Sequence, residues 1–409
     1  MSPSAADARE RGWPPLQPPL AGETGWVARA RALLPMVALE ADAIERERRL
    51  PPALLDALHG QRLFRLLLPR SVDGEELDPL SFFHVIETIA RADASAAWCL
   101  CQAGGCAMAA AYLAPAVAAS IFGRDSRAVL AWGPGPGARA VRIEGGYRVS
   151  GDWSFASGGR HATWLGAHCP VTHPDGTPVT AADGRRVERT LLVPAAAVQW
   201  TDTWNTVGLR GTASDRFSLR DHFVPEDHSI TRDHRFECRE PGPLYRLPAN
   251  LLYQVGFAGV ALGIARGALD AFTALAIDKV PRGQRSLLRD NAVVQSEYAQ
   301  AEAGARAARA WLLQTVDELW REIGQPEARL SMGQRIRVRM ASTHAIHQAR
   351  AAVDRVWNAA GASAIFAEQP LERRFRDIHT VTQQLQGRLS HLETVGAWLL
   401  GADPDLTFV

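Results

Sequence analysis

The sequence has almost no excess of charge of either sign. Its 409 residues include 45 lysines and arginines against 44 aspartates and glutamates. A balance of this kind gives no overall field that would attract nucleic acid or an anionic membrane. We therefore expect no nucleic-acid partner and no membrane partner, and a small neutral or weakly charged substrate is favoured.

Long apolar runs and a secretion signal are missing as well. No stretch reaches 18 uninterrupted apolar residues, and the first residues lack a basic segment followed by an apolar one. These are the patterns of membrane spans and signal peptides. Neither is expected, and the predicted location is the cytoplasm.

Cysteine is scarce, and no group of residues has the spacing of a metal site. The five cysteines are odd in number and lie mostly in apolar surroundings, which favours reduced core thiols over disulfides: Cys99, Cys101, Cys106, Cys169 and Cys238. His344 and His347 stand three residues apart, but no carboxylate or thiol has a suitable spacing to complete a site. No metal is expected.

The chain is too long for one typical core, and its residue pattern changes along its length. Residues 1–24 are rich in proline and small side chains, which predicts a loose arm. Residues 25–127 have the three- and four-residue apolar spacing of helices. Period-two alternation with many glycines and prolines predicts a β domain over 128–235, and helical spacing over 236–409 predicts a C-terminal four-helix bundle.

Several helices can be placed individually from their apolar stripes. Residues 79–90 carry one stripe, and residues 95–113 are so apolar that a helix surrounded by protein is expected. The four helices of the bundle are predicted at residues 251–276, 291–323, 331–359 and 372–400. Glycines recur through the first of these at intervals of three and four, which predicts close packing against another helix.

The sequence pattern places residues 145–164 at the centre of the chain's organisation. Alternation up to a break at Gly151, followed by Trp153, Phe155 and Ser157 at two-residue spacing, predicts a β-hairpin that ends in an aromatic wall and a hydroxyl. Taken alone, the segment favours a hairpin whose aromatics belong to a core, since short aromatic strands are common.

Glycines adjoin this segment on both sides. Gly158 and Gly159 follow Ser157 directly and let the backbone approach a flat ligand. Upstream, residues 132–137 read Trp-Gly-Pro-Gly-Pro-Gly. This loop is either a plain connection or a source of backbone N–H groups for a ligand edge.

Four motifs together resemble the acyl-CoA dehydrogenase superfamily, in the form carried by its flavin-dependent monooxygenase branch, the two-component hydroxylases of group D. They are Gly-Tyr-Arg-Val-Ser-Gly-Asp-Trp-Ser-Phe-Ala-Ser-Gly at 146–158, Gly-Leu-Arg-Gly-Thr at 208–212, Phe-Val-Pro at 223–225, and Pro-Leu-Glu-Arg-Arg-Phe-Arg-Asp at 370–377. The resemblance covers nearly the whole chain. It implies the acyl-CoA dehydrogenase fold: N-terminal helices, a middle β domain and a C-terminal four-helix bundle.

The resemblance also implies a flavin, FAD or FMN, and assigns residues to its ring. The Ser157 hydroxyl would meet the N5 edge of the flavin, and Phe155 would pack beside the ring. The loop with Trp132, Gly133 and Gly135 would lie against the pyrimidine side.

Other residues are implied at the phosphate end of the flavin. Arg285, with Arg282 as the alternative, and the glycine segment at Gly361 would bind the pyrophosphate or adenine held by a neighbouring subunit. A homotetramer is therefore expected. Arginine suits this role because its planar fork can grip two phosphate oxygens.

The carboxylate base of the dehydrogenases is missing. The resemblance puts Leu385, with Gln384 beside it, at one base position and Tyr253 at the other, and neither 251–258 nor 381–388 contains a carboxylate. This favours the monooxygenase branch. Cys106 and Gln384 stand where that branch tends to carry histidines, and four other histidines could replace them: His84, His161, His379 and His391.

We therefore predict a flavin-dependent monooxygenase whose site residues include Ser157, Gln384 and Cys106. Its partners would be O2, a small aromatic or heteroatom-bearing substrate, and a separate reductase that supplies reduced flavin. Two alternatives stay open: a dehydrogenase or oxidase with an unusual base, and a non-catalytic flavin-binding protein.

Overall fold

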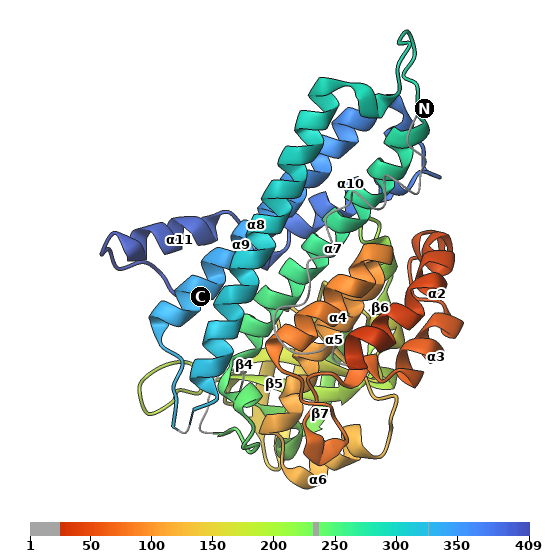
Figure 1. Ribbon diagram of the computed structural model, residues 1–409. Helices are drawn as coiled ribbons and strands as arrows, with labels where there is room; N and C mark the ends of the chain where they lie inside the picture. Colours follow the sequence, from red (N-terminus) through yellow and green to blue (C-terminus); the bar gives the residue numbers. More distant parts are fainter. Residues whose placement is uncertain (1–24, 232–236, 326) are drawn as a thin grey trace.

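Helices from both ends of the chain pack together, and the strands lie in the middle of the sequence (Figure 1). The computed structural model describes residues 25–231, 237–325 and 327–409, so the predicted arm at 1–24 lies outside the described residues. The N-terminal helices are α2 (Gly25–Glu47), α3 (Pro52–Gly60), α4 (Pro79–Ala92), α5 (Ala94–Ala107) and α6 (Pro115–Ala118). The C-terminal helices are α7 (Ala249–Asp278), α8 (Ala292–Ile323), α9 (Met332–Ala360), α10 (Pro370–Thr382) and α11 (Ser390–Leu399).

Two aspartates set the start of α4 and α5. The Asp78 side chain accepts the first free N–H groups of α4, and Pro79 follows at a position where its missing N–H costs nothing. Asp93 does the same for α5 by accepting the N–H of Ala96. The predicted stripe of α4 is fully buried, and all of α5 except Gln102 is buried. Both sequence-based predictions are confirmed.

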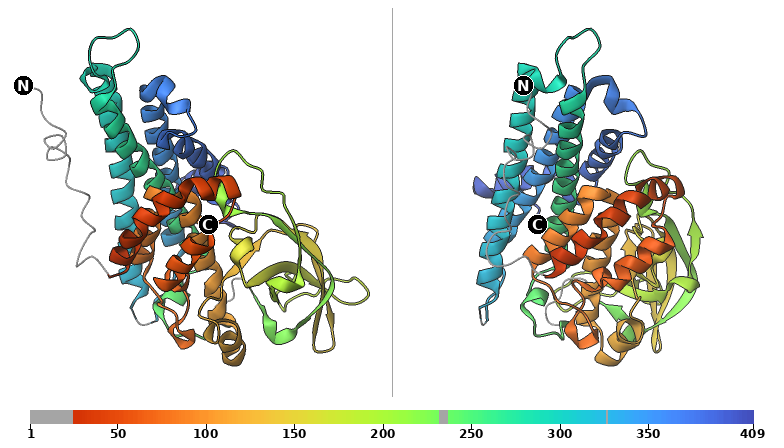
Figure 2. Two further views of the ribbon diagram at one scale, coloured as in Figure 1. Left: turned by 90° about the vertical axis from the view of Figure 1, so that its right-hand side faces the viewer. Right: turned by 45° about the vertical axis from the view of Figure 1, so that its right-hand side comes forward.

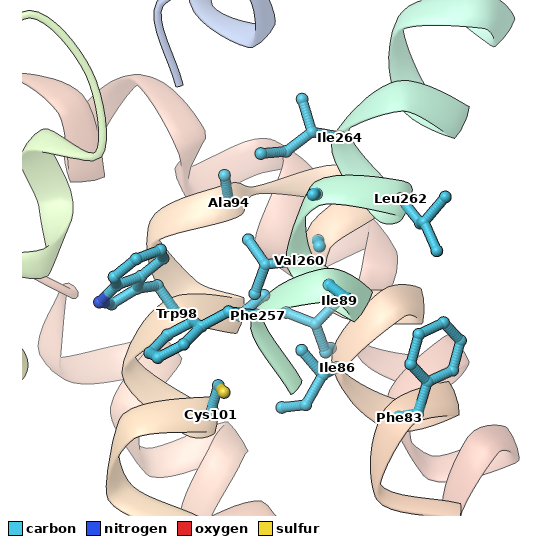
Figure 3. Close-up of a cluster of buried hydrophobic side chains, with 14 of the residues drawn as sticks. Phe83, Ile86, Ile89, Ala94, Trp98, Cys101, Phe257, Val260, Leu262 and Ile264 are labelled. Carbon is cyan, nitrogen blue, oxygen red and sulfur yellow. The ribbon is translucent and has the colours of Figure 1, made fainter. Parts of the chain in front are cut away.

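The glycines of α7 allow it to lie directly on α4 and α5. A Cβ atom on Gly256 would approach the Cys101 sulfur to 2.4 Å, and one on Gly263 would meet the carbonyl oxygen of Glu87 at 2.5 Å. Figure 3 shows the apolar cluster that results, with side chains from all three helices interlocked. The regular glycines of α7 therefore serve helix packing, as the sequence indicates.

One apolar core runs through the N-terminal and the C-terminal helices. The same cluster joins buried residues of α2, α4 and α5 to those of α7, α8, α9 and α10. Figure 2 shows these helices side by side, with the sheet against one flank near their lower end. The predicted division at residue 236 therefore separates two stretches of sequence whose helices share a core.

The fourth predicted helix, 372–400, is wrong as a single element. It is divided into α10, a short 3-10 turn at Leu385–Gly387 and α11. The break follows from tertiary contacts, since Gln386 is buried and its amide bonds the side chains of Arg339 and Asn250. Gly387 packs so closely that a Cβ there would lie 2.9 Å from the carbonyl oxygen of Thr382.

The middle of the chain forms one mixed sheet. Its strands are β1 (Leu130–Gly133), β2 (Arg139–Ile143), β3 (Gly146–Trp153), β4 (Trp164–Thr172), β5 (Glu188–Pro194), β6 (Gln199–Thr201), β7 (Arg216–Pro225) and β8 (Ser229–Ile230). They lie in the order β6-β7-β3-β2-β4-β5-β8, and β1 pairs with β4 in parallel. The predicted β domain is confirmed.

The hairpin predicted at 145–157 is wrong. Gly151 makes an irregularity within the single strand β3, which pairs with β2 on one side and β7 on the other. Phe155 then takes a left-handed backbone conformation with φ of 60°. As a result Trp153 is fully buried, whereas Phe155 is 60 % exposed, so the two aromatics do not share a face.

Two helical segments are long and apolar enough to resemble membrane spans, Ala94–Tyr112 and Ala249–Asp278. Protein covers 94 % of the first window and 61 % of the second. Burial against the other helices and the sheet accounts for their apolar character.

Candidate functional site

The hydroxyl of Ser157 belongs to a buried chain of hydrogen bonds between α5 and the turn before β7. The indole nitrogen of Trp98 donates to Ser157 Oγ at 3.0 Å. Ser157 Oγ lies 2.7 Å from Ser214 Oγ, which lies 2.7 Å from Thr212 Oγ1. Thr212 Oγ1 donates to the carbonyl oxygen of Leu209 at 2.9 Å. All five residues are at least nine-tenths buried.

The end groups of this chain fix its direction. The carbonyl of Leu209 can only accept, so the single proton of Thr212 is committed to it. Ser214 must then donate to Thr212, and Ser157 must donate to Ser214. At the other end the indole N–H of Trp98 can only donate. Ser157 Oγ keeps one lone pair, so it can accept one more hydrogen bond and has no proton left to donate.

Residues with a left-handed backbone conformation lie next to this hydrogen-bond chain. Phe155, Leu209 and Ala213 have φ angles of 60°, 51° and 44°, which non-glycine residues seldom adopt. Two backbone bonds hold the segments together, from the N–H of Ala156 to Asp215 and from the N–H of Gly158 to Thr212. Strain of this kind costs about 1–3 kcal/mol per residue and is common at functional sites.

The carboxylate of Asp215 anchors the same junction. It accepts the backbone N–H groups of Thr203 and Trp204 and pairs with Arg160 at 2.7 Å. Its side chain is almost fully buried. Because its oxygens are committed to three donors, Asp215 stabilises the loop and is a poor candidate for a base.

The exposed ring of Phe155 and the glycine loop form one edge of the site. Phe155 meets the half-buried Trp204 edge to face, with ring centroids 5.9 Å apart. A Cβ on Gly133 would lie 1.8 Å from the carbonyl oxygen of Ser154, and one on Gly135 would strike the ring of Trp153. These two glycines therefore allow the loop to lie against the end of β3.

A neutral polar group lies further along α5, where it faces α7. Cys106 Sγ is 3.3 Å from the hydroxyl of Tyr253, and the amide of Gln102 lies 3.5 Å from both. Burial raises the pKa of the Cys106 thiol to about 12, although hydrogen bonds with Tyr253, Gln102 and the backbone of Trp132 act to lower it. Trp98, Gln102 and Cys106 are four residues apart and share one face of α5. The wall they form carries no ionised group at neutral pH.

The residues present at Ser157 fit the ring of a flavin. An exposed aromatic side chain held in a strained conformation, with an adjacent hydroxyl oxygen that can still accept a bond, suits a flat polar ring. The predicted ring contacts all come from β1, the loop after it and the segment that follows β3: Trp132, Gly133, Gly135, Phe155 and Ser157.

The predicted phosphate-binding residues lie far from Ser157. Arg285 is exposed in the link between α7 and α8, and Gly361 ends α9 with φ of 59° and ψ of −146°, a conformation reserved for glycine. The Lys279 ammonium donates to the carbonyl of Ala360 at 2.5 Å and joins these two segments. Both segments are at the tip of the helices, opposite the sheet (Figures 1 and 2).

Gln384 lies outside any helix. It precedes the turn Leu385–Gly387, and its side-chain oxygen accepts the N–H of Gln386 at 2.7 Å. The structure therefore gives Gln384 a local capping contact. Its expected placement in the last helix is wrong, because α10 ends at Thr382.

The four candidate histidines have other surroundings. His84 lies beside the ion pair of Glu87 and Arg309, and His379 bonds Asp354 at 2.8 Å. His391 bonds the carbonyl of Leu385, and burial followed by the charge of Arg339 lowers its pKa to about 4.

His161 lies closest in sequence to Ser157. It packs on Phe64, and burial together with His59 lowers its pKa to about 3. Within the described residues its Nε2 atom has no hydrogen-bond partner. His161 is therefore a neutral ring beneath the Gly158 turn.

The two histidines of α9 that stand three residues apart contact different partners. His344 meets the ring of Trp311, and His347 bonds the carbonyl of Gly387 at 2.8 Å. Across the three described ranges, no cluster of His, Cys, Asp or Glu has the geometry of a metal site.

Sequence reasoning did not find Trp98, Gln102, Thr212 and Ser214. Gln102 had a usable signal, because it is a lone amide in an otherwise apolar helix. The hydroxyls of Thr212 and Ser214 had none, because their role depends on how the turn folds back onto Ser157.

Known proteins are similar to this chain over most of its length. The model of the acyl-CoA dehydrogenase C-terminal domain matches residues 255–386. The indole-3-acetate monooxygenase of Pseudomonas putida is 29 % identical over 366 residues, which are 88 % of this chain and 90 % of that protein. The flavin-dependent monooxygenase oxygenase subunit HsaA of Rhodococcus jostii is 28 % identical over 367 residues, which are 86 % of this chain and 91 % of that protein.

A solved structure agrees along nearly the full length. XiaF from Streptomyces sp., in complex with FADH2 and glycerol, superimposes with a TM-score of 0.86 and 26 % identity, covering 93 % of this chain and 96 % of that one. The fold, the motifs and these relatives agree: the chain is similar to the flavin-dependent monooxygenases of acyl-CoA dehydrogenase fold, and its residues 255–386 match the acyl-CoA dehydrogenase C-terminal domain.

Proposed function

We propose that this protein is the oxygenase component of a flavin-dependent monooxygenase, which uses reduced flavin and O2 to hydroxylate a small aromatic or heteroatom-bearing substrate. The observation that carries the proposal is the junction at Ser157. There an exposed aromatic ring and a hydroxyl acceptor adjoin a wall of neutral polar side chains from α5 and α7. A dehydrogenase needs a carboxylate to remove a proton from its substrate, and this wall carries none.

Each residue has a task in this proposal. Phe155, Trp132 and the glycine loop would flank the flavin ring, and Ser157 would accept a hydrogen bond from its edge. Bound reduced flavin supplies the electrons that activate O2. Gln102, Cys106 and Tyr253 can orient a substrate hydroxyl or ring nitrogen by hydrogen bonds without taking up a proton, because they are neutral at pH 7.

The substrate class follows from the character of this wall and from the relatives. Neutral side chains suit an aromatic molecule with one or two polar substituents. The Pseudomonas relative is named for indole-3-acetate. A separate reductase would deliver the reduced flavin, in line with the relatives named as oxygenase subunits.

The assembly, the phosphate contacts and the location are part of the proposal. The distance between the Ser157 junction and the tip with Arg285 and Gly361 supports a homotetramer in which each tip serves a neighbouring subunit. A cytoplasmic location and the division at residues 25, 128 and 236 remain proposals. Cys106 also remains a candidate catalytic residue, whereas the capping contact of Gln384 favours a structural role for that side chain.

The function is tested by mixing the purified protein with chemically reduced flavin, isotopically labelled O2 and a panel of aromatic substrates that includes indole-3-acetate. We expect a hydroxylated product that carries one labelled oxygen atom. A reaction without protein controls for the peroxide that free reduced flavin forms. Anaerobic bleaching of oxidised flavin by an acyl thioester, with no labelled product, would instead indicate a dehydrogenase.

A pair of variants tests the flavin-ring site itself. Phe155→Ala should weaken flavin binding about fivefold, because an aromatic stacking contact is worth about 1 kcal/mol. Phe223→Ala is the matched control, since Phe223 is also an exposed aromatic of this sheet but lies in β7, away from Ser157. Equal flavin affinity in the parent and both variants would contradict the assignment of Phe155.

A further inference from the structure

The hydrogen-bond chain at Ser157 has a consequence for which form of the flavin can bind. We infer that Thr212 and Ser214 select reduced over oxidised flavin by holding Ser157 as a pure hydrogen-bond acceptor. The inference rests on the proposed function, because it requires the flavin edge to meet Ser157. It assigns a specificity role to two hydroxyls that do not themselves face the flavin.

The two redox states of a flavin differ at the atom in question. N5 of the oxidised ring carries a lone pair and accepts a hydrogen bond, whereas N5 of the reduced ring carries a hydrogen and donates one. A Ser157 oxygen that can only accept is therefore complementary to the reduced ring. Against the oxidised ring it would place one lone pair opposite another, and an unmade bond of this kind is costly in a buried site.

The contacts at the two ends of the hydrogen-bond chain determine which hydroxyl donates to which. At one end is the carbonyl of Leu209, which also accepts the indole N–H of Trp204 at 2.9 Å. At the other end is the indole N–H of Trp98, which cannot accept. Between these ends there are three hydroxyl protons for three bonds, and the carbonyl end sets their direction, with which the Trp98 donor is compatible.

Burial keeps the hydrogen bonds at Ser157 in this direction. Thr212, Ser214 and Ser157 are 1 %, 3 % and 7 % exposed, so bulk water is nearly excluded from them. Reversing the direction would leave the carbonyl of Leu209 without the Thr212 proton. It would also free the Ser157 proton, because Ser157 Oγ would then accept from both Ser214 and Trp98.

The decisive variant is Ser214→Ala, which removes the acceptor of the Ser157 proton. Ser157 is then free to donate to oxidised N5. We expect oxidised flavin to bind about tenfold more tightly and reduced flavin to bind almost as before. A tenfold change in the affinity ratio lowers the two-electron midpoint potential of the bound flavin by about 30 mV.

Two further variants distinguish an effect of hydrogen-bond direction at Ser157 from a merely structural role of these hydroxyls. Ser157→Ala removes the acceptor, so reduced flavin should bind more weakly while oxidised flavin is little affected or improved. Ser214→Thr keeps a hydroxyl at the same place and should restore the preference of the parent. Ser342→Ala is the control, because Ser342 is a buried serine of α9 that takes no part in the hydrogen bonds at Ser157. It should leave the affinities for both flavin forms unchanged.

The measurements are anaerobic titrations of each variant with oxidised and with chemically reduced flavin, together with the midpoint potential of the bound flavin. An unchanged affinity ratio in Ser214→Ala, with the flavin still bound and the fold intact by thermal melting, overturns the inference. So does a loss of oxidised-flavin affinity in Ser157→Ala, which would mean that Ser157 donates. If the parent binds neither form, the proposed function fails instead.

Discussion

The carboxylate of Asp377 on α10 accepts the backbone N–H of Leu209 at 2.6 Å. Leu209 is left-handed, and its carbonyl receives the proton of Thr212. The neighbouring Arg376 donates to the carbonyl of Val207, and Gly208 is in such close contact that a Cβ there would lie 2.4 Å from the carbonyl oxygen of Arg376. The Arg-Asp motif and the Gly-Leu-Arg-Gly-Thr motif thus form one contact. Through it α10 holds the turn on which the Ser157 chain depends.

Asp377 should make the stability of the protein depend on pH. Burial, followed by the charges of Asp93 and Glu45, raises its pKa from 3.8 to about 7. Between these values the folded state holds a proton that the unfolded state has lost, so the free energy of unfolding falls as pH rises and levels off above pH 7. Asp377→Asn should remove this decline, because an amide does not titrate. Its oxygen can still accept the N–H of Leu209, so the contact is kept.

The measurement is the melting temperature of the parent and of Asp377→Asn across pH 5 to 8. As pH rises, the melting temperature of Asp377→Asn should increase relative to that of the parent. Asp403→Asn, at an exposed carboxylate near the end of the chain, should follow the parent. Parallel profiles for the parent and Asp377→Asn would show that the carboxyl is not protonated near neutral pH in the folded state.

The ion pair between α4 and α8 should have the opposite pH dependence. Arg309 donates two bonds to Glu87, at 2.6 and 2.7 Å. Burial alone would raise the pKa of Glu87, but the charge of Arg309 and bonds from His84 and Arg309 outweigh it and lower the pKa from 4.5 to about 2. The pair therefore stabilises the fold above pH 4.5, and the contribution is lost as pH falls toward 2.

Glu87→Gln should lower the free energy of unfolding at pH 7 by about 2 kcal/mol, because Arg309 is left largely buried without its counter-charge. Chemical denaturation gives the value, and the added substitution Arg309→Leu should recover part of it. Arg321→Gln breaks the exposed pair with Asp317 and should cost less than about 0.5 kcal/mol. Equal losses in the two pairs would mean that burial of Glu87 has no effect.

Much of the fold could be predicted from the sequence because its signals are local. The stripe of α4, the apolar α5, the glycines of α7 and the alternation of the β domain each depend on residues close in the chain. The predicted ring contacts also come from segments that lie together in the structure. Phe155, Ser157 and the loop after Trp132 do gather at one place.

The parts that sequence reasoning missed depend on distant contacts. Phe155 was expected beside Trp153 on one face, but the left-handed turn held by Asp215 and Thr212 rotates it outward. The split of the last helix depends on Arg339, far along the chain, which binds Gln386. The periodicity of apolar residues and the secondary-structure propensities carry no information about contacts between residues distant in the sequence.

Arg285 offers a test of the proposed tetramer. Apolar side chains are exposed near it and along the helices, as expected of surfaces covered by other subunits: Val280, Val293, Ile365, Phe366, Leu399 and Leu400. Helix α11 also projects from the side of the bundle (Figure 1). Arg285→Ala should reduce flavin affinity about tenfold without lowering the melting temperature, because the lost bond is charge-assisted and solvent-exposed.

Flavin titration and light scattering check this prediction together. Arg124→Ala, at an exposed arginine of the N-terminal helices, is the control and should bind flavin like the parent. A protein that is monomeric by light scattering and still binds flavin tightly would contradict the role of Arg285 across a subunit boundary.

Gln384 was expected to act in the reaction, and its observed contact suggests a different outcome for its removal. Its side-chain oxygen caps the turn after α10, next to the buried Gln386. Gln384→Leu should therefore cost about 1 kcal/mol of folding free energy, as the loss of a cap does. Flavin affinity and the ratio of hydroxylated product to hydrogen peroxide should stay near those of the parent. Gln383→Leu, at the exposed neighbouring residue, is the control for stability. If Gln384→Leu melts like the parent but releases more peroxide, its amide acts on the reacting groups, and the catalytic role read from the sequence is the correct one.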